Sequence, residues 1–112
     1  MDKYTVKMFP QTYRDIDKIY GQALLVSNYA DDAIALAEKL EKAILSLEEQ
    51  PYRGAERKYG FYAFKGYRQL TVENYIIIYE VFENEKVVAV VTVKYGKSEF
   101  RNQEISLKYK GY

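Results

Sequence analysis

The feature that most constrains the fold is an eight-residue stretch, 75–82, that is nearly all apolar and rich in β-branched and aromatic side chains. Such a stretch is typical of a central β-strand. A polar turn, 83–86, separates it from a second β-rich stretch, 87–93. Because so short a link cannot hold a parallel crossover, the sequence predicts that these two strands pair antiparallel.

Two more strands are expected upstream. Residues 61–72 predict one strand, interrupted at Gly66 and joined to the central strand by a turn at 73–74. Residues 4–9 alternate in polarity before Pro10 and predict a first strand. The sequence between the two is helical in pattern.

Pro10 suits the first turn of a helix, and Thr12 is a candidate cap. One face of this helix carries Tyr13, Ile16, Tyr20, Ala23, Leu24 and Ser27. An alanine-rich stripe from Ala30 to Leu47 predicts a second helix, which Pro51 ends. Two antiparallel helices on one face of a twisted, mainly antiparallel sheet make an α+β fold.

Composition narrows the chemistry. A chain of 112 residues is expected to form a single domain, 1–112. With no cysteine and no histidine, it has no disulfide, no thiolate or imidazole metal ligand, and no histidine base. We expect no cofactor and no metal. No apolar run is long enough to span a membrane, and residues 1–4 do not begin the basic and then apolar pattern of a secretory signal. We therefore expect a cytoplasmic protein without membrane contact.

Charge is unevenly distributed along the chain. Residues 11–50 hold four basic and eight acidic side chains, whereas the remainder holds thirteen basic and eight acidic ones. A positive half suggests an anionic partner. Ordinary solvated surface explains the same excess equally well.

Two groups of residues could carry function. The first is a basic and aromatic group, which suits single-stranded RNA but is also common on strand surfaces: Arg53, Arg57, Lys58, Tyr59, Tyr62, Lys65, Tyr67 and Arg68. The second is the segment 94–100, where a lysine could stabilise a phosphate transition state and Tyr95 could move a proton. The alternative for the second group is a solvated exit from a strand.

The order of elements resembles the RelE/ParE superfamily of bacterial type II toxin–antitoxin toxins. The resemblance covers about residues 3–100, leaving a polar tail at 101–112. It is carried by the segments Tyr4–Phe9, Arg14–Ile16, Ile19–Tyr20, Ala43–Leu47, Pro51–Gly54, Gly66–Leu70, Asn74–Val81 and Val93–Lys97. It implies a toxin that a cognate antitoxin neutralises by direct contact. Some members cleave messenger RNA on the ribosome, and a ParE-type branch inhibits DNA gyrase.

The resemblance also implies site residues. Arg68 matches the first catalytic cation of the RNA-cleaving branch, but Leu70 and Ile76 stand where further basic residues are usual. Tyr95 and Lys97 are the remaining catalytic candidates, while Phe100 lacks the hydroxyl of the usual late tyrosine. The target-binding candidates are Arg53, Arg57, Lys58, Lys65, Tyr67, Lys94 and Phe100.

The missing basic positions favour a toxin that binds gyrase or another target without cutting RNA. The cations that are retained allow an alternative function, that of a metal-independent, ribosome-dependent endoribonuclease. A third possibility is a non-catalytic member retained for antitoxin binding. The oligomeric state stays open.

Overall fold

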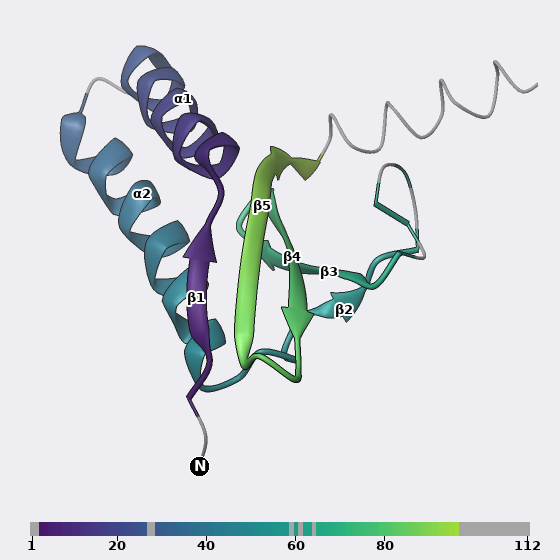
Figure 1. Cartoon of the computed structure of the whole chain (residues 1–112). Coiled ribbons are helices and arrows are strands. Elements are labelled where there is room, and N and C mark those ends of the chain that lie inside the picture. The colour runs from purple at the N-terminus through teal and green to yellow at the C-terminus, as the bar shows by residue number, and fades with distance from the viewer. Residues whose placement is uncertain (1–2, 27–28, 59, 61, 64, 97–112) are drawn as a thin grey trace, which may run out of the picture.

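The computed structural model describes residues 3–26, 29–58, 60, 62–63 and 65–96. Figure 1 shows one strand, two helices and then four strands along the chain. The elements are β1 (Thr5–Met8), α1 (Pro10–Val26), α2 (Ala30–Leu45), a short 3-10 helix η1 (Ser46–Glu48), β2 (Ala55–Glu56), β3 (Tyr67–Val72), β4 (Tyr75–Phe82) and β5 (Val87–Tyr95). No helix in these described ranges is both long and apolar enough to cross a membrane.

The five strands form one sheet in the order β1-β5-β4-β3-β2. The central position of β4 and the antiparallel pairing of β3, β4 and β5 confirm the sequence prediction. β1 pairs with β5 in parallel, and the two helices and β2–β4 lie between these two strands in the chain (Figure 1). The sheet is therefore mixed.

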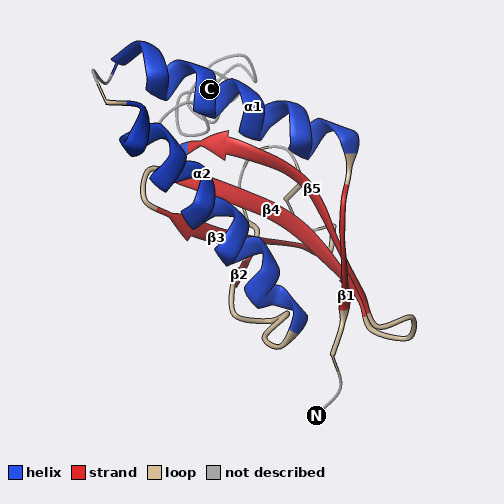
Figure 2. Cartoon of the chain, turned by 90° about the vertical axis from the view of Figure 1, so that its left-hand side faces the viewer, coloured by secondary structure: helices blue, strands red, loops and turns tan. Residues whose placement is uncertain are grey.

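Both helices cover the same face of the sheet (Figure 2). Side chains from β4 and β5 meet those of the helices there, and the buried cluster includes Ile16, Leu40, Ile44, Leu47, Ile77, Tyr79, Val88 and Val90. The predicted α+β arrangement, with a helix pair on one face of the sheet, is confirmed. This layer holds the strand ends in place, since neither the sheet nor the helices could bury their apolar faces alone.

Helix α1 is fixed to β5 by polar contacts along the edge that β1 leaves open. Thr12 is fully buried, and its hydroxyl donates to the carbonyl of Val90 over 2.9 Å. Beyond that point, the Asp15 carboxylate accepts the backbone N–H of Val93 at 3.1 Å and the hydroxyl of Thr92. The Val90 carbonyl also accepts the backbone N–H of Phe9 at 2.9 Å, so Thr12 adds a second donor there. Because β1 ends at Met8, Asp15 supplies the partner of the Val93 N–H on that edge.

One sequence prediction for α1 is wrong and a second is only partly right. The helix begins at Pro10, so Thr12 lies inside its first turn and bonds to β5 instead of capping. The buried face is made by Thr12, Ile16 and Ile19, while Tyr13 and Leu24 are exposed. Of the predicted face, Ile16 is buried and Tyr20 and Ala23 are half-buried, so that part of the prediction is confirmed. Ser27 lies outside the described residues.

The strand predicted to start at residue 61 begins only at Tyr67. The described residues before it form turns, and Tyr62 and Gly66 have positive φ angles of 72° and 84°, which a strand does not accommodate. The two-residue strand β2 was not predicted, because two residues carry no alternation. The described residues just before β3 therefore form a loop and not part of the strand.

We expect Thr12→Val to lower the free energy of unfolding by about 1–2 kcal/mol, because the Val90 carbonyl would lose a buried donor without any change in side-chain volume. Urea denaturation measures this. Thr71→Val on the exposed face of β3 is the matched control and should change little. Equal stability of the two variants would contradict this account of the α1 anchor.

Candidate functional site

The exposed cations of the candidate site lie around the basic loop, defined here as residues 51–60. Arg53, Lys58 and Lys65 are all exposed. Arg53 reaches back to the helical layer, where its Nη1 donates to the Ser46 hydroxyl over 2.6 Å. Lys58 and Lys65 flank the turns that lead into β3. Glu56 in the same loop is exposed as well, so the loop and its flanking turns carry an excess of cations beside one acidic side chain.

Arg68 does not project into solvent from β3. Its Nη2 donates to the main-chain carbonyls of Gly54, at 2.5 Å, and Tyr52, at 3.2 Å. Its guanidinium carbon lies 5.3 Å from the centre of the Tyr52 ring, which is within cation–π distance. Arg68 thus holds the start of the basic loop against β3.

The loop is also held from the core. The backbone N–H of Gly54 donates to the hydroxyl of Tyr79, 3.0 Å away. Gly54 itself is so close to β3 and β4 that an added Cβ would lie 2.4 Å from the carbonyl oxygen of Gln69 and 2.7 Å from the Tyr79 hydroxyl. Only glycine fits at this point of the loop.

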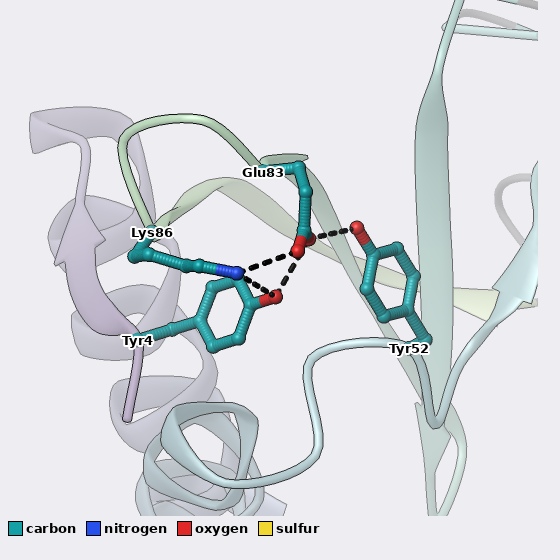
Figure 3. A network of polar contacts seen from close by, with 4 residues as sticks. All are labelled: Tyr4, Tyr52, Glu83 and Lys86. Carbon is teal, nitrogen blue, oxygen red and sulfur yellow. Dashed lines mark hydrogen bonds and ion pairs between the residues drawn. The ribbon is translucent and has the colours of Figure 1, made fainter. Parts of the chain in front are cut away.

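A second polar cluster adjoins the loop at Tyr52. Figure 3 shows Tyr4, Tyr52 and Lys86 converging on the carboxylate of Glu83. The hydroxyls of Tyr52 and Tyr4 donate to Glu83 Oε2 at 2.5 and 2.6 Å, and Lys86 Nζ contacts Oε1 at 2.7 Å. The cluster joins the segment before β1, the basic loop and the β4–β5 turn.

These contacts shift the acid–base properties of the cluster. Hydrogen bonds from Lys86, Tyr4 and Tyr52 lower the pKa of Glu83 to about 2. Donation to Glu83 raises the pKa of Tyr52 to about 12, because a tyrosinate cannot donate that bond. The pKa of Lys86 is raised, chiefly by its bond to Glu83. The cluster therefore keeps one charge pattern over the physiological pH range.

Arg57, a target-binding candidate, is buried, with only 1% of its surface exposed. Its Nη1 donates to Gln69 Oε1 at 2.8 Å, and its backbone N–H donates to the Tyr67 carbonyl. Burial lowers the pKa of its guanidinium. Tyr67 packs edge-on against Tyr62, with ring centres 4.8 Å apart. Arg57 therefore organises the interior of the loop region.

Lys94 lies on the other face of the sheet from Arg68. Along β4, Arg68 pairs with Tyr79 and Lys94 pairs with Ile76, and positions three residues apart on a strand face opposite sides. Tyr95 pairs with Tyr75, on the same face as Arg68 but about 13 Å away along the strand direction. Arg68 and Lys94 therefore do not contribute to one positive surface. Lys97, Phe100 and the tail 101–112 lie outside the described residues.

Sequence reasoning missed Tyr4, Tyr52, Glu83 and Lys86 as a group. Their only sequence signal is the spacing of Glu83 and Lys86 in one polar turn, which allows an ion pair. The tyrosines come from segments far apart in the chain, so no local pattern connects them. In the described part of the chain, no three acidic side chains gather in a way that could hold a metal ion.

Comparisons with known proteins agree with this architecture. The sequence model of one family, the ParE toxin of the type II toxin–antitoxin system parDE, matches residues 6–100. No curated protein gives a significant match. Because the family match covers most of the chain, the protein belongs to the ParE toxin family.

Solved structures show the same fold. The chromosomal ParDE system from P. aeruginosa aligns with a TM-score of 0.68 at 18% identity, over 83% of this chain and 96% of that chain. The RelBE2 toxin–antitoxin complex of Mycobacterium tuberculosis aligns at 0.58 and 20%, over 85% and 93%. A variant of the E. coli toxin RelE in the free state aligns at 0.58 and 14%, over 93% and 97%. The fold is therefore that of the RelE/ParE toxins.

Two glycines provide a matched test of the loop geometry. Gly54→Ala should lower the free energy of unfolding by about 1–3 kcal/mol, because the new methyl group would push the loop away from β3. Gly21→Ala, inside α1 with nothing within 4 Å of the added carbon, should raise it by about 0.5–1 kcal/mol. Chemical denaturation measures both. A tolerated alanine at position 54 would show that the loop is not held so closely.

The pH dependence of stability tests the Glu83 cluster. The folded-state pKa of Glu83 lies below its ordinary value of 4.5, so its contribution is present above pH 4.5 and is lost as pH falls towards 2. The pKa of Tyr52 lies above its ordinary value of 10, so that contribution is present below pH 10 and is lost as pH rises towards 12. The melting temperature of the wild type should exceed that of Glu83→Gln by a constant margin between these limits. A margin that stays unchanged at pH 2.5 would contradict the cluster.

Proposed function

We propose that this chain is the toxin of a type II toxin–antitoxin module, and that it arrests growth by binding a protein target, DNA gyrase, without cleaving RNA. The observation that carries the proposal is the use of Arg68. Its Nη2 is bonded to two main-chain carbonyls and its guanidinium covers the Tyr52 ring, while Lys94 lies on the other face of the sheet. Membership of the ParE family supports the same conclusion.

Cleavage of RNA by attack of its 2′-hydroxyl needs several charged donors around one phosphate. Two positions where the RNA-cleaving branch usually carries basic residues are apolar here, and Leu70 is buried in the core. Ile76 is half-buried on the opposite face of the sheet. A net charge of only +1 also gives weak attraction to ribosomal RNA. These features support a binder over a nuclease.

The target-binding surface in this proposal is the outer side of the basic loop with its flanking turns. Arg53, Lys58 and Lys65 are exposed there, and Tyr67 provides a half-buried aromatic ring beside them. Arg57 lies buried beneath this surface and supports the loop region by its hydrogen bond to Gln69. Such a surface suits an acidic patch on a protein partner, since exposed cations act mainly by attracting and orienting it.

The cognate antitoxin needs a surface of its own. A groove of about 390 Å³ lies between β1 and the two helices and is lined by Val6, Met8, Tyr13, Ile16, Ile44 and Leu45, with Asp17 and Glu41 beside them. Its apolar floor and acidic side chains fit a segment with apolar anchors and basic flanks. The cations of the basic loop do not line this groove.

The second candidate is a RelE-like endoribonuclease. It is favoured by the structural likeness to the RelBE2 complex and to RelE, and by the presence of Arg68, Tyr95 and Lys97 in the sequence. A member kept only for antitoxin binding is the third candidate. The three candidate functions differ in the molecule that is affected when the toxin is expressed: gyrase, messenger RNA or neither.

Purified toxin should inhibit DNA supercoiling by gyrase in vitro, and messenger RNA should remain intact in primer extension after induction. Adding the antitoxin should restore supercoiling. The nuclease function would be supported instead if supercoiling stayed normal at a stoichiometric excess of toxin and new cuts appeared in messenger RNA. Growth without arrest, in the absence of either effect, would support the non-toxic member.

Charge reversal tests the binding surface. Lys58→Glu combined with Lys65→Glu should weaken gyrase binding by about tenfold or more, since attraction becomes repulsion at two exposed positions. Lys42→Glu on the exposed side of α2 is the control and should bind normally. All variants should retain antitoxin binding. Equal gyrase affinity in the double variant and the control would remove the basic loop from the interface.

A further inference from the structure

We propose that Glu83, Tyr52 and Arg68 act as one chain of positioning residues that fixes the start of the basic loop, and that the activity of the toxin depends on this chain. This inference rests on the proposed function, because it concerns the surface assigned there to target binding. In this proposal Arg68 contributes to activity by positioning the basic loop. Glu83, in the β4–β5 turn, contributes in the same way without contacting the target itself.

The first link is the bond between Tyr52 and Glu83. Tyr52 is half exposed, so packing alone does not fix its ring. Its hydroxyl donates to Glu83 Oε2 at 2.5 Å, and Lys86 holds the other carboxylate oxygen at 2.7 Å (Figure 3). Bonds to an ionised acceptor are about twice as strong as neutral ones. The carboxylate therefore anchors a ring that would otherwise change rotamer.

The second link joins the anchored ring to Arg68. The guanidinium lies over the ring face, 5.3 Å from its centre, and Nη2 donates to the carbonyl of the same residue. The shorter bond of Nη2, at 2.5 Å, goes to the Gly54 carbonyl. Rotation of the Tyr52 ring would remove the surface on which the Arg68 guanidinium stacks, and would leave Arg68 held by main-chain carbonyls alone.

The third link is the loop itself. Gly54 is held by Arg68 at its carbonyl and by Tyr79 at its N–H, so the chain direction at this residue is determined from two sides. β2 follows immediately and pairs with β3 at Gln69 and Arg68. The exposed cations at positions 53 and 58 lie on either side of this fixed stretch. Their placement therefore depends on the three positioning residues.

Tyr4 provides an internal control, because it donates to the same oxygen of Glu83 as Tyr52 does, at 2.6 Å, but belongs to the segment before β1. Tyr4→Phe removes a bond of similar kind from the same carboxylate and leaves the loop contact in place. Glu85→Ala removes a carboxylate from the same exposed turn as Glu83. A merely structural role for the cluster would make Tyr4 and Tyr52 equivalent.

The experiment measures amide hydrogen exchange at Gly54 and Arg57 in the full chain, together with the inducer dose that gives half-maximal growth arrest. Tyr52→Phe and Glu83→Ala should each speed exchange at these amides by about tenfold, and their combination should add little to either. Arg68→Lys should speed it as well, although the charge is kept. Each of these variants should require more inducer for arrest, whereas Tyr4→Phe and Glu85→Ala should match the wild type in both measurements.

Unchanged exchange in Tyr52→Phe, or equal acceleration in Tyr4→Phe, would overturn the proposal. Faster exchange without any loss of growth arrest would also overturn it, because activity would then not depend on the loop position. A wild type that causes no arrest would instead count against the proposed function. The exchange data would still decide in that case whether the three residues hold the loop.

Discussion

The hydroxyl of Tyr79 connects the core of this protein to its candidate site. The residue is fully buried in the middle strand of the sheet, where its ring belongs to the cluster beneath the helices. Its hydroxyl accepts the N–H of Gly54 at 3.0 Å, which places the basic loop directly against the sheet. The packing of the helices on the sheet, which buries Tyr79, therefore also determines the position of Gly54 in the basic loop. Arg68 and Tyr52 add further contacts at the same part of the loop.

Charge is divided between the faces of the sheet rather than gathered on one. Arg68 lies on the side of the helices and is used to hold the loop, while Lys94 lies on the opposite side. The exposed cations of the loop remain available to a partner. This division favours recognition of a protein over chemistry on a phosphate, which would need the cations together.

Much of the fold could be predicted from the sequence because its signals are local. The apolar stretch of β4, the short polar turns on both sides of it and the helical spacing of alanines each specify one element and its neighbours. The predictions fail where contacts with residues far away in the chain determine the position of a side chain. Thr12 bonds to a residue 78 positions away, and Arg57 is buried because it folds against Gln69. The candidate site was predicted as a set of residue types, but its organising contacts, Tyr52 with Glu83 above all, join segments that no local pattern relates.

We propose that the toxin binds its protein target through the basic loop. The most direct test is the footprint of gyrase on the isotopically labelled chain, measured as changes in backbone amide resonances on titration. We expect changes concentrated at residues 53–58 and 65–68, with the helices unaffected. Changes confined to the helices or to the end of β5, or no change at saturating gyrase, would contradict it.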